Sequence, residues 1–387
     1  MKRLLRSLRS MVKKGSRVLL LEQREGGIMA TVLEANERAK MIRVRTQREF
    51  RSFDAFTAAQ KTAGNCDRAV VALDAAHAAT IKGVVRATRE NPEATIGAEE
   101  LDALLFHALW NFLNRYRPLA AKKLGVSELE LVVGNIAVCG VRIHGHKVFN
   151  PLDFKGGELV IEFRVTFVTR ALLPTLERLS ASFSEAPMVI ERGALLSESL
   201  GGDNVLVDIG DHMADVYITK SGETTHLGRC AWGNAFVTSA IGRYFGVPDA
   251  IVGDVLRQYA KNQISERMRN ALTAIARKEV AAMKDLVAKT AKRAMGKERI
   301  PVRTTAHGRA RLPNDFVDDG RIRIAVFRDP EPVEQFSFRA GSRIAEIAAE
   351  ERAALITLVY YPYMHPQYVF LNQLLHRRVK WLVPHEG

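Results

Sequence analysis

The stretch Asn204-Val-Leu-Val-Asp-Ile-Gly-Asp-His-Met-Ala-Asp-Val-Tyr-Ile-Thr219 decides the fold of this chain. Its apolar start predicts a buried strand with Asp208 at its end, Gly210 allows a tight turn, and Asp215 opens a second strand. Backbone N–H groups at a glycine turn can approach a phosphate closely, and a nearby carboxylate can order Mg²⁺ through water. The stretch therefore predicts a phosphate-binding hairpin.

Strands and helices alternate on the N-terminal side of this hairpin. We expect antiparallel strands at 17–21, 28–33 and 41–46. Further strands are expected at 69–73, 129–133, 136–144 and 159–167. Residues 99–116 place Leu101, Leu104, Leu105, Ala108 and Phe112 on one face of a helix, and 174–183 is also expected to be helical.

The C-terminal side repeats this order. The expected strands are 204–209, 214–219, 223–227 and 321–327, and the expected helices are 234–244, a long basic stretch over 250–295, 344–360 and 368–383. In each half, the strands come first and helices follow. The pattern therefore predicts a duplicated α/β architecture.

Composition limits the class of protein and of partner. The chain has 387 residues, and single cores rarely exceed about 250–300 residues, so we expect two or more lobes. No apolar run approaches the roughly 18 residues of a membrane-spanning helix. The net charge of +14 indicates an anionic partner, which can be nucleic acid, anionic lipid or an acidic protein segment.

Cysteine and histidine usage predicts neither a disulfide nor a metal site. Cys66, Cys139 and Cys230 lie far apart in the sequence, which is typical of a reduced protein. His212 and His307 have no third ligand at a matching spacing.

The hairpin resembles the second phosphate motif of the superfamily that joins actin, heat-shock chaperone ATPases and sugar kinases. In the FtsA and PilM families, the sequence of this motif is Asp-Ile-Gly-Gly-Gly-Thr-Thr-Asp. Four more stretches resemble FtsA motifs in family order: a turn of its extra subdomain at 139–153, a helix start at 232–241, a charged nucleoside-facing pair at 253–260 and the adenosine turn at 300–308. The resemblance implies an α/β, duplicated actin-like two-lobed fold with an FtsA-type extra subdomain.

That fold predicts a domain order along the chain. The expected parts are a basic amphipathic helix (1–16), the first-lobe core (17–66), the extra subdomain (67–165), the return of the first-lobe core (166–202), the second-lobe core (203–240), a helical second-lobe subdomain (241–299), the second-lobe core and return (300–365) and an amphipathic C-terminal segment (366–387).

The resemblance also assigns a degenerate nucleotide site without a catalytic residue. Arg24, Asp211 and His307 replace glycines of the family, and Asp211 would repel a phosphate by about 4 kcal/mol at roughly 4 Å. ATP and Mg²⁺ are therefore expected to bind weakly or not at all, as in a degenerate ATPase. The candidate residues are Glu22, Arg24, Asp208, Gly210, Asp211, Asp215, Gly233, Asp254, Arg257, His307 and Gly308.

Both ends of the chain have the pattern of membrane-surface helices. Residues 2–17 are basic with apolar residues at helical spacing, and residues 368–383 carry apolar positions among Arg, Lys and Trp. The alternative for each end is packing on the protein's own surface. The candidate membrane-contact residues are Leu4, Leu8, Met11, Arg3, Arg6, Leu374, Arg378 and Trp381.

The function implied by the resemblance is an FtsA-like scaffold of bacterial cell division. Such a protein is cytoplasmic, lies on the inner face of the cell membrane, tethers FtsZ-type filaments and self-associates into actin-like filaments or dimers. Two alternatives stay open: a PilM-like cytoplasmic platform of a pilus or secretion machine, and an active actin-like ATPase. Nucleic acid is not the expected partner, because the basic stretch at 250–299 lacks interleaved aromatic residues.

Overall fold

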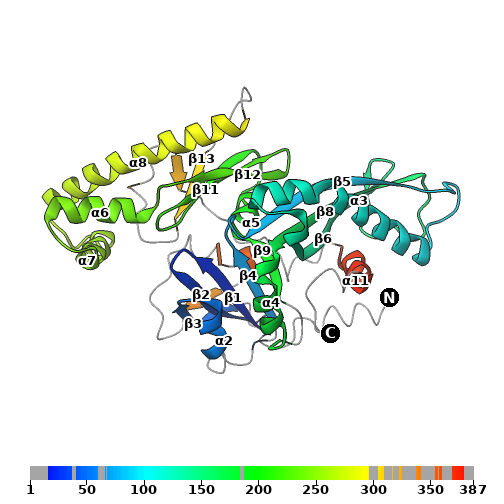
Figure 1. The fold of residues 1–387 in the computed structure, drawn as a ribbon, viewed down its shortest axis with the longest axis horizontal. Coiled ribbons are helices and arrows are strands. Elements are labelled where there is room, and N and C mark those ends of the chain that lie inside the picture. Colours follow the sequence, from blue (N-terminus) through cyan, green and yellow to red (C-terminus); the bar gives the residue numbers. More distant parts are fainter. Residues whose placement is uncertain are drawn as a thin grey trace. The chain divides into compact units, whose positions relative to one another are not determined.

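Three sheets organise the chain in a computed structural model (Figure 1). The structure describes residues 16–36, 41–59, 66, 68–183, 187–295, 304–308, 316, 322–324, 337–340, 354–355, 357–359 and 368–378. The chain divides into unit 1 (Met1–Arg192, Asp329–Ile347 and Ile356–Gly387) and unit 2 (Gly193–Arg328 and Ala348–Leu355). The predicted N-terminal helix, with Leu4, Leu8, Met11, Arg3 and Arg6, lies outside the described residues.

The large sheet of unit 1 has the strand order β15-β3-β2-β1-β4-β9. Strands β1, β2 and β3 are antiparallel, and β4 and β9 continue the sheet in parallel from β1. The short helices α2 (Phe53–Ala59) and α4 (Leu173–Ser180) bury Phe56, Leu176 and Leu179 in the core. The strand bounds are β1 Ser16–Arg24, β2 Gly27–Asn36, β3 Met41–Phe50, β4 Arg68–Leu73, β9 Met188–Glu191 and β15 Ser337–Ala340.

The sheet of unit 2 repeats this topology in the order β12-β11-β10-β13-β14. Again three antiparallel strands are followed by two parallel ones. The duplicated α/β architecture predicted from the sequence is therefore confirmed. The bounds are β10 Asn204–Ile209, β11 Ala214–Lys220, β12 Glu223–Cys230, β13 Thr304–Gly308 and β14 Ile322–Ile324, and α5 (Arg192–Ser199) follows β9.

Unit 1 also contains a small layer, formed by a sheet of order β5-β8-β6-β7 and the helix α3. The apolar face of α3 packs on this sheet through residues such as Leu105, Phe112 and Phe163. The bounds are β5 Ala78–Thr88, α3 Ala98–Leu124, η2 Glu128–Glu130, β6 Leu131–Ile143, β7 His146–Lys147, β8 Glu158–Thr169 and η3 Arg170–Leu172. The boundaries 67–165 for an FtsA-type subdomain stay a prediction.

Two details of this layer differ from the sequence prediction. Helix α3 does not end near residue 116 but continues through Pro118 to Gly125, whose φ of 68° ends it in the left-handed conformation that glycine tolerates. The strands expected at 129–133 and 136–144 form the single strand β6, because register irregularities at Val133/Asn135 and Val138/Gly140 keep it paired with β8.

Three helices flank the sheet of unit 2: α6 (Asn234–Phe245), α7 (Asp249–Ala260) and α8 (Glu266–Met295). The basic helical stretch predicted over 250–295 is divided into α7 and α8 by a break at 261–265. Asn262 takes a positive φ of 58°, and the Ser265 hydroxyl accepts the Met268 N–H, which starts α8.

The C-terminal helix α11 (Val369–Arg378) packs on the small layer of unit 1. Leu371 and Leu375 are fully buried, and Leu374 packs against the same cluster. The Asn372 side chain accepts the Val138 N–H (2.7 Å) and donates to the Val138 carbonyl (3.3 Å), so it pairs with the edge of β6 as a neighbouring strand would. The face that holds Leu374 therefore lies against the protein in this structure. The Arg378 side chain and Trp381 lie outside the described residues.

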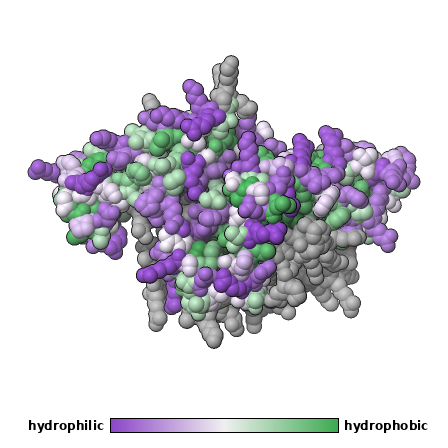
Figure 2. Space-filling view, in the orientation of Figure 1, coloured by the Kyte–Doolittle hydropathy of each residue, from purple (hydrophilic) through white to green (hydrophobic). Residues whose placement is uncertain are grey.

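Figure 2 shows hydrophilic side chains over most of the coloured part of the surface, with hydrophobic residues in separate patches. Among the described residues, no helix has the length and apolarity needed to cross a membrane.

Candidate nucleotide site

The hairpin that decides the fold lies at the end of the central strands of unit 2. Asp208 on β10 stands directly opposite Asp215 on β11, and on its other side the backbone of His307 on β13 is in register. Gly308 is in register with Ile209. The Gly210 N–H donates to the Met213 carbonyl (2.8 Å) and closes the turn. The sequence-predicted residues Asp208, Gly210, Asp211, Asp215, His307 and Gly308 are therefore brought together.

The turn of this hairpin is hydrogen-bonded to the first residues of α6. The Asn234 N–H donates to the Gly210 carbonyl (3.0 Å), and the Ala235 N–H donates to the Asp211 carbonyl (2.8 Å). Gly233 makes this contact possible, since a Cβ there would lie closer to the Asp211 carbonyl than real Cβ atoms approach. A phosphate bound at a helix N-terminus accepts hydrogen bonds from the free backbone N–H groups of the first turn. In α6, two of these N–H groups already donate to carbonyls of the hairpin turn.

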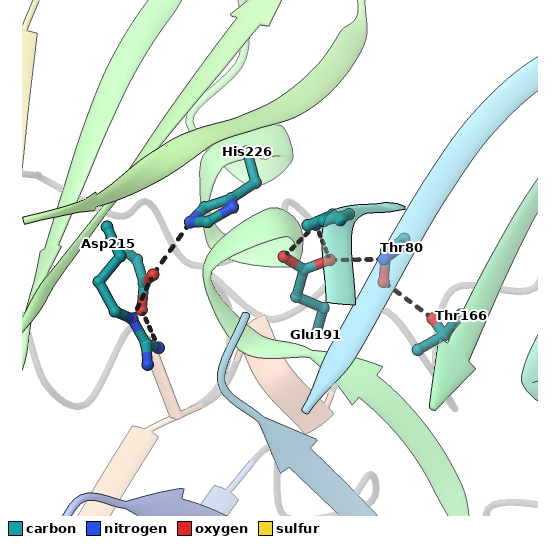
Figure 3. Close-up of polar contacts among 7 residues, drawn as sticks. Thr80, Thr166, Glu191, Asp215 and His226 are labelled. Carbon is teal, nitrogen blue, oxygen red and sulfur yellow. Dashed lines mark hydrogen bonds and ion pairs between the residues drawn. The ribbon is translucent and has the colours of Figure 1, made fainter. Parts of the chain in front are cut away.

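Asp215 is held by two basic residues of the neighbouring strand β12 (Figure 3). Arg229 donates to both carboxylate oxygens, at 3.0 Å from Nε and 2.8 Å from Nη2, and His226 Nε2 lies 2.9 Å from Oδ1. Burial disfavours the ionised form. The hydrogen bonds from His226 and Arg229, together with their charges, outweigh burial and lower the pKa of Asp215 to about 2. The carboxylate is therefore ionised and already has a cationic partner.

In the first hairpin, in unit 1, the carboxylate of Glu22 is also paired with basic side chains. Glu22 ends the apolar run of β1 and is 2% exposed. The Arg192 guanidinium donates to it at 3.0 Å from Nε, and Arg24 Nη2 lies 3.7 Å from its other oxygen. Both arginines neutralise the carboxylate that stands for the aspartate of the first loop in the resemblance.

Asp254 and Arg257 form an ion pair with each other on the surface of α7, where both side chains are more than half exposed. The charges expected to face a nucleoside are therefore paired with one another.

Sequence reasoning missed Arg192, Arg229 and His226. Arg229 could have been found, because the strands predicted at 214–219 and 223–227 form a hairpin that brings their charged residues opposite one another. Arg192 carries no such signal, since it is separated from Glu22 by 170 positions.

Mg²⁺ with ATP fits this set of residues poorly. Two candidate metal-ordering carboxylates, Glu22 and Asp215, already pair with guanidinium groups, and carbonyls of the second turn occupy N–H groups of α6. Within the described parts of the chain, no group of three or more His, Cys, Asp or Glu side chains could hold a metal ion.

Comparisons with known proteins give structural likeness alone. No protein-family model and no curated protein matches the chain. Among solved structures, a PilM–PilN type IV pilus biogenesis complex matches at 14% identity over 93% of this chain and 98% of that chain, with a TM-score of 0.47. A ParM from Bacillus thuringiensis with AMPPNP matches at 10% identity over 94% and 100% of the two chains, with a TM-score of 0.32.

A third structure, a Bacteroides thetaiotaomicron protein of actin-like ATPase fold and unknown function, matches at 11% identity over 62% of this chain and 80% of that chain, with a TM-score of 0.30. These values carry no argument about function. The duplicated strand order and the two hairpins define the class: the chain has an actin-like ATPase fold.

Proposed function

We propose that the chain is an actin-fold scaffold whose nucleotide site has been replaced by internal contacts. The observation that carries the proposal is that a carboxylate of each hairpin is paired with basic side chains of the same chain. Arg192 and Arg24 neutralise Glu22, Arg229 neutralises Asp215, and the Gly210–Asp211 carbonyls occupy the start of α6. A nucleotide would have to displace these contacts, each of which is charge-assisted or backbone-based.

The scaffold is proposed to act in the manner of FtsA, at the inner face of the cell membrane, by tethering an FtsZ-type filament and by self-association. Its basic charge supports an acidic partner surface, because the exposed side chains of α8 include Arg267, Arg277, Lys278, Lys289, Lys292 and Arg293 against Glu266 and Asp285. The same fold and charge equally support a PilM-like cytoplasmic platform of a pilus or secretion machine. Pull-down with a purified FtsZ-type protein, and in parallel with a purified PilN-type protein, separates the two roles.

Calorimetric titration with Mg-ATP tests the degenerate site. We expect no binding with a Kd below about 10 μM. The variant Asp211→Gly/His212→Gly removes the negative charge nearest the turn and should strengthen binding, up to the nearly thousandfold that about 4 kcal/mol represents. Tight binding by the unaltered chain would contradict the proposal, and it would favour the alternative of an active ATPase.

A further inference from the structure

The two consecutive residues Glu191 and Arg192 join different parts of unit 1. Glu191 is the last residue of β9 and Arg192 the first of α5, and both are buried. Successive side chains at the end of a strand point to opposite sides. Here one points to the small layer and the other to the first hairpin.

On one side, the small layer holds Glu191 through three hydrogen bonds from two residues (Figure 3). Lys123 Nζ, in the last turn of α3, lies 2.7 and 2.9 Å from the two carboxylate oxygens, and the Thr80 N–H of β5 donates at 2.5 Å. The Thr80 hydroxyl lies 2.9 Å from the Thr166 hydroxyl of β8, so the sheet is tied to the same point. The Glu191 side chain is completely buried and that of Lys123 is 17% exposed.

On the other side, Arg192 holds the first hairpin. Its Nε donates to Glu22 at 3.0 Å, and both side chains are 3% exposed. Lys123, Glu191, Arg192 and Glu22 therefore form a row of alternating charges, all of which except Lys123 are buried. Removing one charged side chain of the row leaves its partner as an uncompensated charge, which costs free energy. A displacement of the side chains at one end of the row is therefore opposed by the ion pair at the other end.

We infer that Glu191 and Arg192 are positioning residues through which the small layer of unit 1 sets the conformation of the first hairpin loop. The inference rests on the proposed scaffold function, in which no nucleotide controls that loop. The ion pair of Glu22 with Arg192 supports this assignment. Arg192 directly follows Glu191, which the small layer holds in place, so the orientation of Glu22 depends on the small layer.

Hydrogen exchange on the full chain, without nucleotide or partner, tests the row. In Lys123→Met, amide exchange in the β1–β2 turn, at 23–28, should accelerate at least about fivefold. The matched control is Lys122→Met, which removes an exposed lysine of the same helix turn and should leave the turn unchanged. Lys123→Arg keeps the charge and should restore slow exchange.

The reverse direction gives an independent measurement. Glu22→Gln should accelerate exchange around Thr80 by a similar factor, because an equilibrium coupling is reciprocal. If Lys123→Met fails to fold, Lys123→Gln and Glu22→Gln decide the question. Faster exchange confined to α3 and β5 in the Lys123 variant overturns the inference and leaves the scaffold function intact. Tight Mg-ATP binding would instead overturn the proposed function while the coupling stood.

Discussion

At the scale of single residues, the chemistry of this chain depends on which side chain neutralises which carboxylate. A buried carboxylate without a cation costs free energy and tends to take up a proton. Asp215 avoids this because Arg229 binds both its oxygens. Glu22 avoids it in the same way, through the Arg192 guanidinium.

Asp215→Asn tests the strength of this pairing. The pKa of Asp215 falls from 3.8 to about 2 in the fold. The resulting stability is therefore fully present above about pH 4 and is lost as the pH falls toward 2. Urea unfolding at pH 7 should show a loss of about 2 kcal/mol in the variant, and its stability should depend less on pH between 4 and 2.

Asp254→Asn is the matched control for that change, because it removes a carboxylate from an exposed ion pair with Arg257. Its effect should stay below about 1 kcal/mol. Equal losses in the two variants would show that burial adds nothing to the Asp215 pair.

At the scale of elements, the contact between the second hairpin and α6 depends on one position without a side chain. Gly233 lets the Asp211 carbonyl reach the start of α6, where the Ala235 N–H binds it at 2.8 Å. The second hairpin and α6 are therefore joined by backbone hydrogen bonds.

Gly233→Ala should open this contact, because the added methyl group overlaps the Asp211 backbone. We expect a loss of about 1–3 kcal/mol in the free energy of unfolding, measured by urea denaturation. Gly253→Ala is the control within a helix. Nothing lies within 4 Å of its added Cβ, and alanine should stabilise α7 by up to about 1 kcal/mol. A neutral Gly233→Ala would mean that the turn can move aside without loss.

The docking of α11 is a second element-scale contact. Asn372→Ala removes both hydrogen bonds to Val138 without changing the buried Leu371 and Leu375. Stability should fall by about 1–2 kcal/mol, and the amide of Val138 should exchange faster. Gln373→Ala, one position along the same helix, should change neither quantity. Unchanged protection of Val138 would show that α11 does not cover the edge of β6 in solution.

At the scale of the whole molecule, the two ends of the chain have different expected roles. Helix α11 contributes Tyr368, Leu371 and Leu375 to the core of the small layer. The N-terminal segment has the basic amphipathic pattern of a helix on an anionic membrane.

Deleting residues 1–14 should therefore abolish flotation with anionic vesicles while the free energy of unfolding stays the same. Binding of the full chain should weaken as salt rises, since the Debye length shrinks from about 10 Å at 0.1 M to about 3 Å at 1 M. Deleting 368–387 should instead destabilise unit 1, because each fully buried leucine contributes about 1.5–3 kcal/mol. Vesicle binding that survives the first deletion and not the second would place the membrane anchor at the C-terminal end.

The sequence by itself determined the duplicated α/β fold, because apolar strands and glycine turns are local signals that recur in each half. The side chains Arg24, Asp211 and His307 in the hairpin and turn stretches can also be read directly from the sequence. The long-range pairing of charged and polar side chains depends on the tertiary structure alone. The pairing of Arg192 with Glu22 and of Asn372 with Val138 joins residues separated by 170 and 234 positions. Such contacts have no periodicity along the chain, because they arise only when separate elements pack together.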